Sequence, residues 1–316
     1  MRMLVTGADG FIGRCVCKRL CEAGHEVVAA CRRGGREPPG TLPAAIGAIE
    51  EYEAWHSLLD GIDVVIHLAA VTHSADLMSR AAAPRYASIN VAATRRLAKA
   101  ARDANVRRLV FMSSIKVNGE HSSALPGFRF DDPPAPRDNY GASKWRAEQS
   151  LKELAMEDDL AVTVLRPPLV YGPGMKGNLL ALMRWIARGR VVPLANISNQ
   201  RSMIYVGNLA DAVVCAARDG PVGLQGFTLA DIELSTPDLV RAMARSLDVE
   251  AKIFSCPSWL LQALGMLIGR REAIERLTGS LLVDAAGARD GLGWEPKTPF
   301  AQAMRETAAW FQSTLK

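Results

Sequence analysis

The stretch RMLVTGADGFIG, residues 2 to 13, decides the fold, because a short apolar segment runs directly into three glycines. Residues 2 to 6 are typical of a buried strand, and Gly7, Gly10 and Gly13 follow with the spacing GxxGxxG at the start of a helix. Gly7 permits the tight turn, Gly10 lets the backbone approach a pyrophosphate, and Gly13 lets the helix pack on the strand. The helix N-terminus adds N–H donors and a positive dipole. The stretch therefore predicts a dinucleotide-binding site.

Strand-like and helical segments alternate through the first half of the chain. The pattern predicts strands at 2–6, 26–31, 63–68, 108–113 and 161–166, and helices at 11–23, 54–60, 85–104 and 139–156. Strands this uniformly apolar are buried on both faces, and βαβ alternation gives a parallel sheet. We therefore expect an α/β fold, a Rossmann-like doubly wound parallel sheet. The dinucleotide-binding domain is placed at 1–170, and a smaller C-terminal substrate-binding region, interleaved with the sheet, at 171–316.

Composition narrows the class of protein. The chain has 316 residues, of which 49% are hydrophobic, and its net charge of +5 comes from scattered arginines without a basic, aromatic-rich run, so no nucleic-acid partner is expected. Its six cysteines form no CxxC pattern, which indicates neither a metal site nor a disulfide framework. The N-terminus does not resemble a signal peptide. The longest apolar stretch, 257–269, is too short to cross a bilayer and is expected to be a buried helix or a lid. These features predict a cytoplasmic protein with no membrane partner.

The end of the second strand bears on the choice of cofactor. A carboxylate at that point accepts hydrogen bonds from the adenosine ribose of NAD and repels a 2′-phosphate. Here the strand is followed by Arg32 and Arg33, with no carboxylate until Glu37. Guanidinium groups can bind the 2′-phosphate of NADP through paired, charge-assisted hydrogen bonds. The pattern favours NADP(H), with NAD(H) possible if Arg32 stacks on adenine or faces solvent.

A tyrosine and a lysine lie four residues apart in DNYGASKWRAE, residues 138 to 148. Asp138 is a predicted N-cap, so Tyr140 and Lys144 share one face of a helix. The nearby ammonium group would lower the pKa of the phenol toward neutrality, where it can exchange a proton with a substrate hydroxyl. The alternative is an interfacial tyrosine and a solvated lysine.

With these features the sequence resembles the extended short-chain dehydrogenase/reductases, the nucleotide-sugar epimerase, dehydratase and reductase group. The resemblance runs from Met1 to about Asp211 and continues more loosely to the C-terminus. Its motifs occur in the family's order: the glycine turn, HLAA at 67–70, Asn90, the serines at 113 and 114, YxxxK, RPPLVYGPG at 166–174 and RSMIYVGNLAD at 201–211.

The resemblance implies three catalytic residues. Tyr140 is the acid and base, the Ser114 hydroxyl orients the substrate and stabilises developing charge, and Lys144 lowers the tyrosine pKa and holds the nicotinamide ribose. Ser113 is an alternative for the serine role. The implied cofactor contacts are Gly7, Gly10, Phe11, Ile12, Gly13, Arg32, Ile49, Leu68, Ala69, Ala70, Asn90, Tyr140, Lys144 and Pro167.

The substrate side is implied by fewer motifs. Asn178 and Leu179 match a pair that contacts the nucleotide diphosphate, and Arg201 matches an arginine that meets the pyrophosphate; surface or capping roles are the alternative. Thr72 and His73 could line the sugar pocket, with an ordinary loop histidine as the alternative. Lys116 could reach a substrate phosphate or hydroxyl, or be an exposed lysine at a strand end.

Two departures from the family bear on function. Ala48 stands where relatives have an aspartate that contacts adenine, and no extra acid and base accompany the serine, which counts against a 4,6-dehydratase. Ala48 and the missing carboxylate after the second strand indicate weak retention of the cofactor, and a reductase must exchange its spent cofactor at each turnover. The preferred interpretation is therefore a 4-ketoreductase acting on a UDP-sugar in bacterial surface-polysaccharide biosynthesis. The alternative is a UDP-hexose 4-epimerase acting on UDP-glucose or UDP-GlcNAc; a dinucleotide-binding protein without activity is a third hypothesis.

A homodimer is also expected by the resemblance, through the helices near 85–104 and 140–156. These helices carry small apolar side chains that could form the dimer interface or, equally well, an intramolecular core. They are Leu97, Ala98, Ala101, Ala147 and Leu151.

Overall fold

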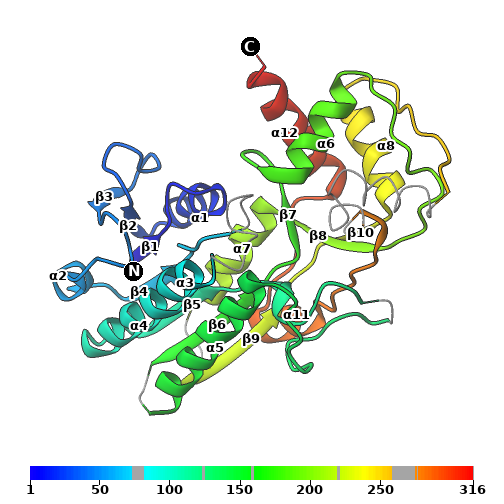
Figure 1. The fold of residues 1–316 in the computed structure, drawn as a ribbon. Coiled ribbons are helices and arrows are strands. Elements are labelled where there is room, and N and C mark those ends of the chain that lie inside the picture. Colours follow the sequence, from blue (N-terminus) through cyan, green and yellow to red (C-terminus); the bar gives the residue numbers. More distant parts are fainter. Residues whose placement is uncertain are drawn as a thin grey trace.

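A seven-stranded sheet forms the centre of the computed structural model (Figure 1), which describes residues 1–72, 82–122, 125–157, 160–218, 221–257, 275 and 277–315. All neighbouring strands in this sheet are parallel. In spatial order they are β3 (Leu42–Ala45), β2 (Glu26–Cys31), β1 (Arg2–Thr6), β4 (Val64–His67), β5 (Arg108–Met112), β6 (Ala161–Arg166) and β9 (Gly223–Thr228). The strand order reverses between β1 and β4, the point at which doubly wound sheets bind ligands. The predicted fold class is confirmed.

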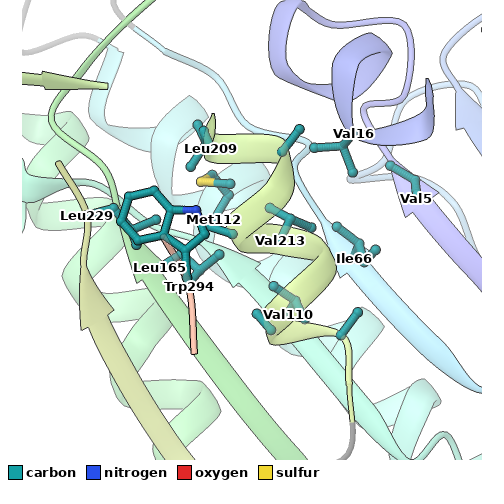
Figure 2. Close-up of a cluster of buried hydrophobic side chains, with 14 of the residues drawn as sticks. Val5, Val16, Ile66, Val110, Met112, Leu165, Leu209, Val213, Leu229 and Trp294 are labelled. Carbon is teal, nitrogen blue, oxygen red and sulfur yellow. The ribbon is translucent and has the colours of Figure 1, made fainter. Parts of the chain in front are cut away.

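Helices cover both faces of this sheet because alternate residues of each buried strand point to opposite sides. On one face, α1 (Phe11–Glu22) and α7 (Val206–Ala216) share a core with the strands. Figure 2 shows Leu209 and Val213 of α7 packed over Val110 and Met112 of β5. On the other face, a second core joins the strands to α2 (Trp55–Leu59), α4 (Ala93–Asp103) and α5 (Asn139–Glu157).

A smaller lobe follows β6 and carries its own hydrophobic core. A three-stranded sheet in the order β10 (Ile232–Leu234), β8 (Arg201–Tyr205), β7 (Leu169–Tyr171) packs with α6 (Gly177–Ala187), α8 (Thr236–Ser246) and α12 (Phe300–Ser313). Between β8 and β10 the chain returns to the large sheet through α7 and β9, and α11 (Ala286–Leu292) lies beside β9. The two parts are therefore interleaved along the chain, while a boundary at residue 170 stays a prediction.

Most predicted elements form within one or two residues of their expected bounds, but two strands of the large sheet were not predicted. β3 contains Pro43 and lies at the sheet edge, where a missing backbone donor is tolerated. β9 contains two glycines, and Gly226 faces the Phe130 ring so closely that an added Cβ would lie 1.8 Å from it.

The apolar stretch predicted at 257–269 lies outside the described residues from 258 onward. None of the helices in the described ranges has the length and apolar character needed to span a bilayer.

The side chains proposed for a dimer interface lie inside the subunit. Leu97, Ala98, Ala101, Ala147 and Leu151 are all 0% exposed and belong to the core between the sheet and α4 and α5. Of the two roles left open for these residues, the structure shows the intramolecular core. A homodimer itself stays a prediction.

Candidate active site

The glycine turn forms a cradle that side chains would fill. Gly7 has φ +69°, and an added Cβ there would lie 2.9 Å from the Cα of Ala69 in the loop after β4. A Cβ on Gly10 would lie 3.0 Å, and one on Gly13 only 2.1 Å, from the carbonyl oxygen of Gly7. The backbone of the turn is therefore bare at the N-terminus of α1, where a pyrophosphate can approach the N–H groups.

A buried histidine holds the loop after β4 against this turn. Thr94 Oγ1 donates to the carbonyl oxygen of Asn90 at 2.8 Å, so it accepts from Nε2 of His67, 2.8 Å away. Nδ1 of His67 then accepts from Thr6 Oγ1 at 2.7 Å, and that oxygen in turn accepts from the N–H of Ala69 at 3.3 Å. Burial lowers the pKa of His67 to about 3, so the imidazole is neutral in this network. The chain of hydrogen bonds positions residues 68–70, which sequence analysis assigned to the cofactor.

Asn90 connects the same loop to the catalytic helix. It lies in a π-helical stretch, η3 (Ala87–Ala92), between α3 (Ala83–Tyr86) and α4. Its Oδ1 accepts from the N–H of Val71 at 2.8 Å, and its Nδ2 donates to the carbonyl oxygen of Val71 at 3.0 Å and to Ser143 Oγ at 2.9 Å. Because both amide hydrogens bind groups of the chain itself, Asn90 has no donor left for the cofactor. It instead positions the loop after β4, to which the cofactor contacts at residues 68–70 were assigned.

The three predicted catalytic residues come together at the C-terminal end of β5. Asp138 is the expected N-cap of α5, because its Oδ1 accepts from the N–H of Gly141 at 2.7 Å. Tyr140, in the first turn, has its phenol hydrogen-bonded to the Ser114 side chain. One turn later, Lys144 Nζ lies 6.0 Å from the centroid of the Tyr140 ring.

Burial dominates the electrostatics of this group. It raises the pKa of Tyr140 above its usual value, and the hydrogen bond with Ser114 opposes that rise only in part. Burial also lowers the pKa of Lys144 to about 7, against the opposing effect of Glu148. Desolvation is the largest effect on the phenol pKa in the nucleotide-free protein, and the expectation that Lys144 brings this pKa toward neutrality stays a prediction.

Ser113 is occupied elsewhere. Its hydroxyl donates a short hydrogen bond to Glu148, a buried carboxylate that Arg166 also binds through Nε at 3.0 Å and Nη2 at 2.5 Å. The remaining guanidinium nitrogen, Nη1, donates to Asn118 Oδ1 at 3.0 Å. This geometry favours Ser114 for the catalytic role. Sequence analysis missed Glu148, although its place one turn after Lys144 on the same helix face could have indicated it.

The remaining cofactor candidates differ in exposure. Phe11 and Ile12 are half-buried at the start of α1, and Arg32 is exposed just beyond β2. Pro167 is buried, and its carbonyl oxygen accepts from the N–H of Ile115 at 3.0 Å. Ile49 is 8% exposed within the core that contains α4 and α5, which leaves little of its side chain for adenine.

The substrate candidates are more dispersed. Asn178 is exposed in the first turn of α6, whereas Leu179 packs into the core of the smaller lobe. Arg201 Nη1 donates to the carbonyl oxygen of Gly279 at 2.9 Å. Thr72 is exposed at the end of a described range, and His73 lies outside the described residues.

Lys116 is held between two carboxylates. Its Nζ forms ion pairs with Glu120 Oε1 at 2.8 Å and Asp138 Oδ2 at 2.5 Å, and its side chain is 19% exposed. Lys116 is therefore not the exposed strand-end lysine of the alternative, and its contact with a substrate phosphate or hydroxyl stays a prediction. Its contact with Asp138 ties the segment after Ser114 to the N-terminus of α5.

Comparison with known proteins places this geometry in a family. The sequence model of the NAD dependent epimerase/dehydratase family matches residues 3–226. The chain belongs to the NAD-dependent epimerase/dehydratase family. The resemblance to extended short-chain dehydrogenase/reductases is confirmed, and the chain is an enzyme of this family.

Three members of the wider family illustrate the similarity. A UDP-glucose 4-epimerase of Vibrio cholerae is 34% identical over 311 residues, which cover 98% of this chain and 95% of that protein. An N-acetyl-α-D-glucosaminyl-diphospho-ditrans,octacis-undecaprenol 4-epimerase of Escherichia coli O157:H7 is 28% identical, covering 88% of this chain and 81% of its own length. The structure of MoeE5 in complex with UDP-glucose and NAD superposes with a TM-score of 0.79 at 25% identity, over 100% of both chains.

Proposed function

We propose that this protein is a nucleotide-sugar 4-epimerase that inverts C4 of a UDP-hexose with a retained NAD. The observation that carries the proposal is the convergence of Ser114, Tyr140 and Lys144 after β5, at the same edge of the parallel sheet as the glycine turn after β1. Similarity to the Vibrio cholerae 4-epimerase along 98% of the chain supports epimerisation. The sequence favours a 4-ketoreductase instead, but no comparison supports that reading specifically, and the epimerase alternative now has the better support.

The chain's own residues would act in the following way. A bound nicotinamide supplies the acceptor and donor of the C4 hydride. Tyr140, as phenolate, accepts the proton of the C4 hydroxyl while C4 is oxidised, and returns a proton to the same oxygen after the keto sugar has presented its other face. The Ser114 hydroxyl orients that oxygen, and a positive charge on Lys144 stabilises the phenolate. Because oxidation and reduction cancel, the cycle needs no external reductant.

The residues present fit a nicotinamide dinucleotide. The bare turn at Gly7 and Gly10 suits the pyrophosphate, and Lys144 is within the site to contact the nicotinamide ribose. We propose NAD in place of the NADP(H) favoured by the sequence, because MoeE5 is complexed with NAD and an epimerase benefits from a tightly held cofactor. Cytoplasmic location and a role in surface-polysaccharide biosynthesis stay predictions.

The test begins with the purified protein. Denaturation should release close to one NAD per chain, and the native protein should interconvert UDP-glucose and UDP-galactose without added nucleotide, as followed by anion-exchange chromatography. UDP-N-acetylglucosamine belongs in the same assay, because the E. coli relative is named for an N-acetylglucosaminyl substrate. Consumption of NADPH with a UDP-4-keto sugar, without interconversion, would establish the reductase instead. A protein that binds the dinucleotide but turns over neither substrate would support the non-enzymatic hypothesis.

A further inference from the structure

The segment between β2 and β3 turns a carboxylate back toward the sheet. Glu37 lies six residues beyond the end of β2, yet its Oε1 is buried and has no hydrogen-bond partner among the described residues. A buried carboxylate oxygen without a donor is costly, because the protein does not replace the hydrogen bonds that water would supply. A bound ligand with hydroxyl groups would supply the donor that such an oxygen lacks.

This oxygen lies close to the C-terminal end of β2. A Cβ built on Gly34 would lie 3.9 Å from Glu37 Oε1. Burial raises the pKa of the Cys31 thiol, at the last position of β2, and the carboxylates of Asp9 and Glu37 add to that rise. The Glu37 carboxylate is therefore near the strand end, although five residues separate it from Cys31 in sequence.

The loop that carries Glu37 is anchored on both sides. Arg14 of α1 donates through Nε to the carbonyl oxygen of Asp9 at 3.1 Å and through Nη2 to that of Arg36 at 3.2 Å, which joins the glycine turn to the residue before Glu37. On the other side Pro38 is buried, and its carbonyl oxygen accepts from Thr41 Oγ1 at 2.6 Å. Glu37 thus has a fixed place rather than that of a freely solvated side chain.

The end of the second strand is where doubly wound dinucleotide sites receive the adenosine ribose. A carboxylate there accepts hydrogen bonds from the ribose hydroxyls, and it repels the 2′-phosphate of NADP. The two arginines that indicate NADP, Arg32 and Arg33, are instead exposed at the surface. The half-buried Glu37, with its buried Oε1, is thus better placed than the exposed arginines to decide the cofactor.

We propose that Glu37 accepts hydrogen bonds from the adenosine ribose hydroxyls and thereby selects NAD over NADP. It would supply the carboxylate that is missing from the residues directly after β2. The inference rests on the proposed function only in requiring a nicotinamide dinucleotide at the glycine turn. It needs no assumption about the sugar or about the direction of the reaction.

The experiment measures cofactor binding in the absence of any sugar. Full-length protein freed of nucleotide is titrated with NADH and with NADPH, with binding followed by nicotinamide fluorescence. The wild type should bind NADH more tightly, and Glu37→Gln should lose about 10- to 100-fold in NADH affinity, as expected for hydrogen bonds to a charged group, while NADPH affinity stays equal or improves. Glu37→Asp should keep the preference for NADH with weaker binding. Circular dichroism verifies that each variant is folded.

Two controls separate this role from a general charge effect. Glu26→Gln makes the same change at the opposite end of β2, where Glu26 is paired with Arg2, and should leave both affinities unchanged. Glu22→Gln makes the same change near the end of α1, where Glu22 is paired with Arg19, and should also leave both affinities unchanged. Tighter binding of NADPH by the wild type, or a ratio that Glu37→Gln does not alter, would overturn the proposal while leaving the epimerase open. Binding of neither nucleotide would remove the proposed function as well.

Discussion

Lys144 Nζ donates a hydrogen bond to the carbonyl oxygen of Met112 at 2.8 Å, directly above the Phe111 ring, whose centroid is 4.6 Å from the nitrogen. The ammonium group is thus held by a neutral acceptor and an aromatic face, and both lie on β5. This arrangement fixes the position of the lysine without fully compensating its charge, because a buried cation is stabilised most by an adjacent anion.

The stability of the nucleotide-free protein should depend on the charge of Lys144. Burial lowers the lysine pKa to about 7, so between pH 7 and the ordinary lysine range the unfolded chain binds more protons than the folded one. The contribution of this residue to the free energy of unfolding should therefore rise with pH, by at most about 1.4 kcal/mol per pH unit. Urea unfolding of wild type and Lys144→Met at pH 6, 7, 8 and 9 measures the difference. A gap that stays constant above pH 7 would contradict the low pKa.

Removing the phenol oxygen should abolish most of the chemistry. Tyr140→Phe is expected to lower kcat about 10²- to 10⁴-fold, the usual range for loss of a general acid–base group, without releasing the cofactor. The interconversion assay measures the loss of kcat, and the amount of NAD released on denaturation shows whether the cofactor is retained. Tyr52→Phe is the matched control, since its ring packs on that of Trp55 at the start of α2. Full turnover by the Tyr140 variant would exclude the proposed mechanism.

The two neighbouring serines should give opposite phenotypes. Ser114→Ala removes the hydroxyl that meets the phenol and should lower kcat about 10²- to 10³-fold with little loss of stability. Ser113→Ala removes a donor from the buried Glu148 and should cost about 1.5–3 kcal/mol in the free energy of unfolding, with a much smaller change in kcat. The reverse result would move the catalytic role to Ser113.

Breaking the buried ion pair should be more damaging than removing it. The Arg166 side chain is only 2% exposed, and Glu148→Gln removes the carboxylate that pairs with it. This change should lower the free energy of unfolding by about 3–5 kcal/mol. Replacing both residues, with Glu148→Gln and Arg166→Met, should cost less than the sum of the two single changes. Denaturant unfolding of the four proteins measures the coupling, and strict additivity would contradict it.

Sequence analysis was most successful where local pattern and final environment agree. The apolar strands and the glycine turn predict the sheet from β1 to β6, because buried strands and a bare turn each require particular residue types. β9 was not predicted because its glycine is required by the distant Phe130 ring. The site shows the same limit: Ser113 and Ser114 are told apart only by Glu148 and Arg166, and the buried position of Glu37 depends on the path of a loop.

The place of β9 has a consequence for how the chain is made. Its register runs from Gly223 opposite Ala161 to Thr228 opposite Arg166, so the last strand of the large sheet is synthesised well after the first six. While residues 167–222 emerge from the ribosome, the outer edge of β6 has no partner and is open to wrong pairing. The nascent enzyme therefore passes through an interval in which its sheet is incomplete, and translation rate or chaperone supply at that stage should influence its yield.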